Sequence, residues 1–196
     1  MEMDNRLYIY FASQTGNAEE IANNLQADLK RSIGLAATVV NCAKFDPKTF
    51  MFQTNKIFVL ATHYDGEAPN NGRKFREWIL NEKNHKKNGF SHMNYAVFAL
   101  GDINYKDTFT KFGKDVNKLM TKFGATCIKE IGIASNHNGR GLHWYNMWKK
   151  GAIMAISETL NLQIQASVNS HIKQTNLLGP QKAIGYLKCV PRVRCG

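Results

Sequence analysis

The sequence predicts an α/β fold in which a doubly wound, five-stranded parallel sheet carries helices on both faces. Two observations predict it. Five short runs are apolar throughout, which is typical of parallel strands buried on both sides. Longer segments with apolar residues at spacings of three and four separate these runs, which is typical of covering helices. The 196 residues are enough for one domain with a core and too few for two ordinary domains.

The elements follow in order along the chain. The expected strands are residues 7–12, 37–40, 57–61, 95–100 and 126–133. The expected helices are residues 18–33, a short segment around Phe75 and Ile79, residues 112–123 and residues 142–160. Gly34 and Gly124 are the expected stops of two helices. Right-handed crossovers between parallel strands then place helices on both faces of one sheet.

Beyond the last helix the pattern changes. Periodicity fades from Gln163, and Gly179-Pro180 break the chain. We therefore expect one domain over residues 1–162 and a basic tail or linker over residues 163–196, with an extra strand or disorder left open. No apolar run approaches the ~20 residues of a membrane span, and the start lacks the pattern of a secretory signal. We expect a cytoplasmic protein without a transmembrane segment.

Cysteine usage agrees with a reducing compartment. Cys42, Cys127, Cys189 and Cys195 form no C-x-x-C pair, and no histidines surround them at metal-ligand spacing. We expect four thiols and no metal site. A disulfide between Cys189 and Cys195 stays open as an alternative.

The charge balance is strongly basic. The formal net charge is +11, from 26 Lys and Arg against 15 Asp and Glu. Basic runs such as residues 83–87 are either solvated surface or contacts for an acidic protein, an anionic membrane or nucleic acid. No aromatic and basic stacking motif accompanies them, so we expect no nucleic-acid partner.

The first chemically informative loop follows the first expected strand. It reads Ser13, Gln14, Thr15, Gly16, Asn17 and Ala18 and runs straight into a helix. Hydroxyl groups, a tight glycine turn and the N–H groups of a helix start are the chemistry that binds a phosphate. The alternative is a plain N-cap at Thr15. The P-loop pattern is absent.

Two further loops follow the third and fourth expected strands, and each carries one tyrosine. The first contains Thr62, His63, Tyr64, Asp65 and Gly66, and the second contains Leu100, Gly101, Asp102, Asn104, Tyr105 and Phe109. Ligands of doubly wound sheets bind beyond the carboxyl ends of the strands, so both rings are expected at the binding edge. Two such rings can enclose a flat aromatic cofactor, whereas either one alone is more simply explained by packing.

At these three loops the chain resembles the flavodoxin-like FMN domain of the diflavin reductases, over about residues 7–160. Residues 13–19 are similar to the phosphate loop of that family. Residues 62–69 resemble its T-Y-G-E-G-x-P loop, and residues 100–105 resemble its L-G-D-x-x-Y motif. The resemblance implies the sheet order 2-1-3-4-5 and FMN as cofactor. It implies that residues 13–18 hold the phosphate and that Tyr64 and Tyr105 stack on the isoalloxazine, with Leu100, Gly101, Asn104 and Phe109 lining the pocket.

Three departures from the family stand out. Asp65 occupies the position of a family glycine, and Gly66 follows one place later. The Tyr105-to-Phe109 spacing is one residue longer than the family's Y-x-x-F. The usually acidic loop after the fifth strand reads Ala134-Ser135-Asn136-His137-Asn138-Gly139-Arg140. Without that acidic loop, a basic partner is a poor fit.

The resemblance implies a carrier that passes single electrons and that does not oxidise NADPH by itself. No segment resembles an FAD/NADPH module, and no G-x-G-x-x-G follows an expected strand. We therefore expect a separate or fused FAD/NADPH reductase module as donor and an acceptor protein with an acidic face. Two alternatives are an NAD(P)H:quinone reductase-type flavoprotein and a basic flavodoxin-like binding scaffold.

Overall fold

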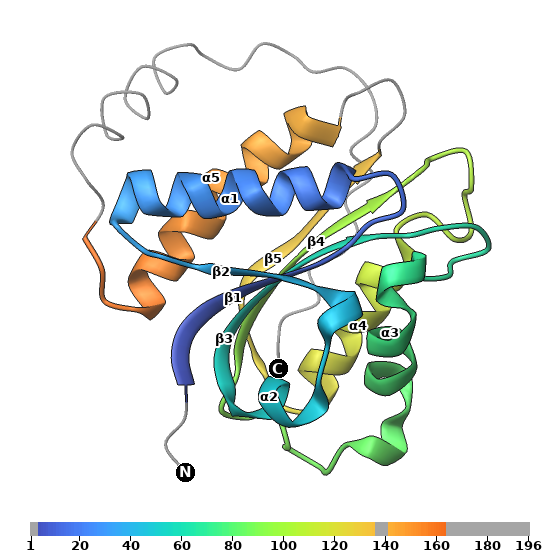
Figure 1. The fold of residues 1–196 in the computed structure, drawn as a ribbon, viewed down its shortest axis with the longest axis horizontal. Helices are drawn as coiled ribbons and strands as arrows, with labels where there is room; N and C mark the ends of the chain where they lie inside the picture. Colours follow the sequence, from blue (N-terminus) through green and yellow to red (C-terminus); the bar gives the residue numbers. More distant parts are fainter. Residues whose placement is uncertain (1–3, 136–140, 164–196) are drawn as a thin grey trace.

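Residues 4–135 and 141–163 are described by the structure, a computed structural model (Figure 1). Ten strands and α-helices alternate along this part of the chain. They are β1 Asp4–Ala12, α1 Asn17–Ile33, β2 Thr38–Asn41, α2 Pro47–Phe52, β3 Gln53–Ala61, α3 Arg73–Leu80, β4 Asn94–Gly101, α4 Lys111–Lys122, β5 Thr126–Ser135 and α5 Gly141–Thr159. Short 3₁₀ turns lie at Cys42–Lys44, Asn70–Gly72 and Glu82–Asn84. The expected tail, residues 163–196, lies outside the described residues from position 164 on.

The five strands form one parallel sheet in the order β2-β1-β3-β4-β5. At its centre Ile9 of β1 lies opposite Val39 of β2 and Ile57 of β3. This confirms the predicted fold class and the strand order that the resemblance implied. In this order the chain leaves β1 toward one side for β2 and returns to the other side for β3. The carboxyl ends of β1 and β3 therefore flank the point where the winding reverses.

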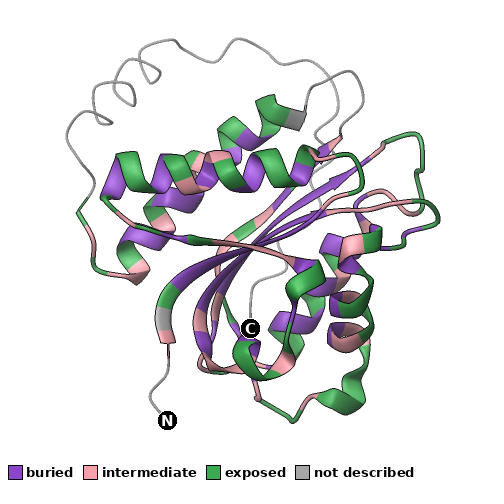
Figure 2. Ribbon diagram, in the orientation of Figure 1, coloured by how far each residue is buried: buried purple, intermediate pink, exposed green. Residues whose placement is uncertain are grey.

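Helices cover both faces of the sheet, as Figure 1 shows. α1 and α5 pack on one face, over a core that contains Ile9, Val59 and Phe98. α3 and α4 pack on the other, over a core rich in aromatic rings. There Phe58 of β3 stacks on Phe75 of α3, with ring centroids 5.7 Å apart and planes 14° apart. Buried residues lie on the strands and on the inward sides of the helices (Figure 2).

One helix was not expected from the sequence. α2 is a six-residue helix before β3, with Asp46 as its N-cap and Pro47 in its first turn. The Asp46 carboxylate accepts a hydrogen bond from the N–H of Thr49 at 2.8 Å. The 3₁₀ turn before it begins at Cys42, whose thiol is fully buried; burial raises the pKa of this thiol above its usual range.

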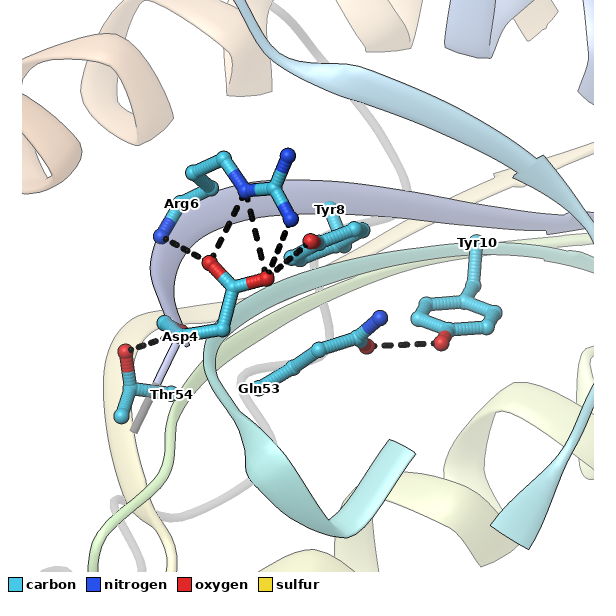
Figure 3. Close-up of polar contacts among 6 residues, drawn as sticks. All are labelled: Asp4, Arg6, Tyr8, Tyr10, Gln53 and Thr54. Carbon is cyan, nitrogen blue, oxygen red and sulfur yellow. Dashed lines mark hydrogen bonds and ion pairs between the residues drawn. The ribbon is translucent and has the colours of Figure 1, made fainter. Parts of the chain in front are cut away.

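The amino end of the sheet carries a polar cluster, drawn in Figure 3. The Asp4 carboxylate accepts hydrogen bonds from the guanidinium of Arg6, which is 2.7 Å away, and from the hydroxyl of Tyr8. These bonds hold the pKa of Asp4 well below its usual range. Deeper in the sheet, the Tyr10 hydroxyl donates to the Gln53 side chain at 2.7 Å (Figure 3). This cluster lies at the opposite end of the strands from the three informative loops.

Candidate functional site

The three loops with expected ligand chemistry leave the carboxyl ends of β1, β3 and β4. These strands are consecutive neighbours in the sheet, so the loops meet at one edge, at the right of Figure 1. Ala12, the last residue of β1, lies opposite Leu60 of β3, and Ala61 lies opposite Leu100 of β4. The fold therefore brings the loops after residues 12, 61 and 101 together.

The β1 loop enters α1 through Gly16, which is the N-cap of the helix and has φ of 93°. This left-handed conformation favours glycine, and no atom lies within 4 Å of the position its Cβ would occupy. The Ser13 hydroxyl accepts hydrogen bonds from the N–H of Gly16 at 3.0 Å and of Ala18 at 3.2 Å. Thr15 is exposed and is not the N-cap, so the alternative of a plain Thr15 cap is wrong. Ser13 and the start of α1 together form an open, hydrogen-bonding loop.

Two asparagines that the sequence did not single out hold this loop in place. The N–H of Ser13 donates to Oδ1 of Asn71 at 3.0 Å. The side-chain NH₂ of Asn71 donates in turn to Oδ1 of Asn41 at 3.1 Å, at the end of β2. Gln14 contributes as well, because its Oε1 accepts from the N–H of Asn70 at 3.2 Å. The segment before α3 and the end of β2 thus brace the β1 loop.

The loop after β3 turns sharply at Asp65 and Gly66. Both have positive φ, 33° and 85°, as a type I′ turn requires, and Asp-Gly is a preferred pair there. The N–H of Glu67 donates to the carbonyl of Tyr64 at 2.7 Å, and the N–H of His63 donates to the carbonyl of Glu67 at 2.8 Å. The departure at Asp65 is thereby explained, because Asp65 and Gly66 share the turn.

Side chains from α3 and α4 fix this turn. Lys111, the first residue of α4, covers Gly66 so closely that a Cβ there would lie 2.5 Å from Lys111 Cδ. The Lys111 ammonium pairs with Asp115 at 2.6 Å. On the other side, Glu67 pairs with Arg76 of α3 at 2.8 Å. The Tyr64 turn is therefore attached to both α3 and α4.

The loop after β4 folds back over its own start. A Cβ at Gly101 would lie 2.7 Å from the backbone nitrogen of Thr110, so the return needs glycine at this point. Within the loop, the Asp102 carboxylate accepts from the N–H of Asn104 at 2.9 Å, an Asx turn. The N–H of Tyr105 donates to the carbonyl of Asp102 at 3.1 Å. In the longer segment that follows, the N–H of Thr108 donates to the carbonyl of Tyr105 at 3.1 Å, which gives that segment a defined turn.

Both site tyrosines are exposed. Tyr64 is 65% and Tyr105 49% exposed, and Ile103 beside Tyr105 is 54% exposed. Simple packing over the domain edge, the alternative for each ring, does not describe side chains this open. The His63 ring lies against Tyr64, with centroids 4.3 Å apart. The two tyrosine rings thus lie on neighbouring loops and expose much of their surface to solvent.

The remaining predicted residues have supporting positions. The Thr62 N–H donates to the carbonyl of Leu100 at 2.8 Å, and its hydroxyl accepts from the N–H of Phe112 at 3.2 Å. Thr62 therefore ties β3 to β4 and α4, while the Leu100 side chain is fully buried in the core. Phe109 is half-buried, and its carbonyl accepts from the Lys114 ammonium at 2.9 Å. Asn17 is exposed in the first turn of α1.

A separate hollow of about 450 Å³ lies between α1 and β2, on the β2 side of β1. Its lining is Phe11, Glu19, Asn23, Val39, Val40, Asn41 and Lys44. It contains neither site tyrosine and none of residues 13–18. We locate the candidate site at the loops instead, because doubly wound sheets bind ligands where the winding reverses.

Two further observations concern only residues 4–135 and 141–163. No group of three or more His, Cys, Asp and Glu in this part of the chain could hold a metal ion. None of its helices is both long and apolar enough to cross a membrane. Cys42 and Cys127 are thiols, and Cys127 donates to the carbonyl of Lys129 at 3.2 Å. The loop at residues 136–140 and the cysteines Cys189 and Cys195 lie outside the described residues.

The parallel sheet of order 2-1-3-4-5, with a hydroxyl-rich helix start beside two exposed tyrosines, defines a flavodoxin-like protein. The chain belongs to the flavodoxin family, whose family model, described as Flavodoxin, matches residues 9–142. FMN is the cofactor of this family. The residues present fit it: Gly16 leaves the helix start open for a phosphate, and the tyrosines offer rings for stacking.

Known proteins resemble the chain over most of its length. It is 32% identical to the sulfite reductase [NADPH] flavoprotein alpha-component of Vibrio parahaemolyticus, over 83% of the chain and 25% of that relative. It is 29% identical to the NADPH–cytochrome P450 reductase of Candida tropicalis, over 79% of the chain and 22% of that relative. The chain thus spans about a quarter of the length of these curated relatives. Among solved structures, a flavodoxin of Streptococcus pneumoniae matches with a TM-score of 0.59 at 27% identity, covering 74% of this chain and 95% of that one.

Proposed function

We propose that this chain is an FMN-binding electron-transfer domain of the diflavin-reductase type. The observation that carries the proposal is the meeting of the β1, β3 and β4 loops at one edge of the sheet. That edge offers a helix start for a phosphate and two exposed aromatic rings for a flat ring system. When bound, FMN accepts electrons and passes them on singly, and this redox chemistry belongs to the cofactor.

The residues have distinct proposed roles. Ser13 and Thr15 would donate hydroxyl hydrogen bonds to the phosphate, with the positive end of α1, at residues 14–18, behind them and the N–H groups of Gly16 and Ala18 held by the Ser13 oxygen. Tyr64 and Tyr105 stack on the two faces of the isoalloxazine. The backbone of Asp65, Gly66, Gly101 and Asp102, together with Thr62, His63, Asn104 and Phe109, would complete the pocket that holds the ring.

The proposed partners are a separate or fused FAD/NADPH reductase module as donor and an acceptor protein with an acidic face. The names of the relatives support a reductase, since both are reductases that use NADPH and are about four times as long as this match. The acidic acceptor rests on the net charge of +11. A cytoplasmic setting completes the proposal, because a protein with buried thiols such as Cys42 suits a reducing compartment.

The quinone-reductase alternative predicts paired electron transfer from NAD(P)H, and the scaffold alternative predicts no flavin at all. A visible spectrum of the purified chain with added FMN separates the scaffold from the other two. A redox titration then separates the carrier, which we expect to take up its two electrons in resolved steps, from a quinone reductase.

The first prediction tests the phosphate loop. Changing Ser13 and Thr15 together to alanine removes two hydroxyl donors, each worth about 1 kcal/mol or more toward a charged group. We expect FMN affinity to fall by at least tenfold and riboflavin affinity to change by less than twofold, because riboflavin lacks the phosphate. Fluorescence titration with both flavins measures this. Equal losses for the two flavins would put the phosphate elsewhere.

A further inference from the structure

The two helical layers of the sheet differ sharply in charge. The layer of α3, the turn after it and α4, residues 73–90 and 111–124, contains ten Lys and Arg against three Asp and Glu. The opposite layer, formed by helices α1 and α5, contains four of each. Half of the Lys and Arg in the part of the chain that the structure describes therefore belong to one layer, which we call the basic face.

The basic side chains of α4 form a row that one ion pair joins to the turn after α3. Lys111, Lys114, Lys118 and Lys122 recur at spacings of three and four, which places them along one side of α4. At the far end of α4, Lys122 pairs with Glu82 of the turn after α3, and this joins the two segments. Arg76, Lys111 and Lys122 form ion pairs. The other seven are exposed: Arg73, Lys74, Lys83, Lys86, Lys87, Lys114 and Lys118.

This face begins at the candidate site. Lys111 covers Gly66 of the Tyr64 turn, and the Lys114 ammonium lies 5.4 Å from the centre of the Phe109 ring. A partner protein bound to the basic face would therefore lie next to the Tyr64 and Tyr105 loops, at one end of α4. Charge that continues from a redox site along a helix layer is suited to guiding a charged partner to that site.

The chemistry of the face favours an acidic protein over the other anionic surfaces. In residues 73–90 and 111–124 no large hydrophobic side chain is exposed, so a membrane would find no apolar anchor. The same segments expose no aromatic ring on which a base of single-stranded nucleic acid could stack. Exposed lysines around a few ion pairs match carboxylates on a folded partner.

We propose that the α3–α4 layer is the docking surface for an acidic redox protein, whose redox centre is thereby brought to the Tyr64 and Tyr105 loops. This rests on the proposed electron-transfer function and adds the location of the contact. The α1–α5 layer, which carries balanced charge, takes no part in steering.

Two double variants of the full chain with equal net charge test this. Lys86→Glu with Lys118→Glu changes the basic face, and Lys30→Glu with Lys150→Glu changes the opposite layer. All four side chains are exposed. The probe is cytochrome c in two forms that carry the same haem: the native basic protein and the succinylated acidic one. One electron passes from the reduced, FMN-loaded chain to ferric haem, and stopped-flow absorbance follows the ferrous haem formed.

At low ionic strength, where the Debye length is about 30 Å, we expect the basic-face variant to reduce succinylated cytochrome c about tenfold more slowly than the parent chain. The control variant should slow by less than about twofold. With native cytochrome c the basic-face variant should become faster. At about 1 M salt, where the Debye length is ~3 Å, the differences should disappear.

Equal slowing by the two variants would mean that only net charge matters and would overturn the proposal, as would no effect of either. Calorimetric binding of ferric succinylated cytochrome c to the chain without reduction gives a second readout. Failure of the proposed function and failure of the docking surface can be told apart. A chain that binds no FMN refutes the proposed function. FMN-loaded variants that bind succinylated cytochrome c with equal affinity refute the docking surface alone.

Discussion

Lys56 is a lysine buried at the amino end of the sheet. It belongs to β3, its exposed fraction is 0%, and its ammonium lies 4.5 Å from the centre of the Phe50 ring. The amine donates to the carbonyl of Gln53, at the start of the same strand. Burial lowers its pKa to about 7, although the charge of Asp4 opposes this shift. The protein therefore buries, beside the Phe50 ring, an amine whose pKa lies near neutral pH.

This amine makes stability depend on pH. Below pH 7 Lys56 is charged in both the folded and the unfolded chain, so burying its charge lowers the free energy of unfolding by the full penalty. Between pH 7 and 10.5 the unfolded chain binds a proton that the folded chain does not, so the free energy of unfolding rises with pH. We expect Lys56→Met to raise the free energy of unfolding at pH 6 by about 2 kcal/mol and to remove this rise. Urea unfolding at pH 6 to 9 measures both, and an unchanged pH profile would contradict the assignment.

Tyr64 and Tyr105 make the second prediction at this scale. Stacking of each ring on a flavin contributes about 1 kcal/mol beyond buried area, so each change to alanine should weaken FMN binding about fivefold or more and reduce the quenching of FMN fluorescence. Changing Ile103, an exposed neighbour that is not aromatic, to alanine serves as the matched control. If neither tyrosine change affects affinity or quenching, the stacking roles are wrong.

The elements show what the sequence can and cannot predict. All five strands were expected because each contains a continuous apolar run. β3, however, begins four residues before the expected position 57. Gln53, Asn55 and Lys56 are polar side chains that the sequence gives no reason to expect in the core, and only tertiary contacts bury them. α2 was missed because six residues show no period, although Asp46-Pro47 is a recognisable start. At the site, motif spacing identified the loops, but the bracing by Asn71 and Asn41 joins residues distant in sequence and left no local pattern.

The Tyr64 turn gives the prediction at the scale of elements. Gly66 has φ of +85° and lies beneath Lys111, so Gly66→Ala is strained in its backbone and meets the Lys111 side chain. We expect it to lower the free energy of unfolding by about 1–2 kcal/mol and to weaken FMN binding. Asp65→Asn is the matched control, because asparagine also suits a type I′ turn. Thermal unfolding and FMN titration check both, and an undisturbed Gly66→Ala variant would show that the turn is adaptable.

At the scale of the whole molecule, the described residues form a single sheet with one site at its carboxyl edge. Under the proposed function, this chain exchanges electrons with proteins rather than with nicotinamides. We expect the isolated, FMN-loaded chain to leave NADPH unoxidised on the scale of minutes and to gain activity when an FAD/NADPH reductase module is added. Absorbance of NADPH with an artificial acceptor measures this. Rapid turnover by the pure chain would favour the quinone-reductase alternative.

The buried thiol of Cys42 is a natural probe of local opening in the molecule. An alkylating reagent can reach this sulfur only when the 3₁₀ turn after β2 lifts away from the core, so the alkylation rate reports how often that turn opens. The residue before it, Asn41, holds Asn71, which in turn holds the backbone of Ser13. Opening at Cys42 is therefore expected to release the hydrogen bonds that hold the loop after β1. If FMN binds at residues 13–18 as proposed, we expect it to slow this alkylation, so that its occupancy can be measured at a thiol outside the site.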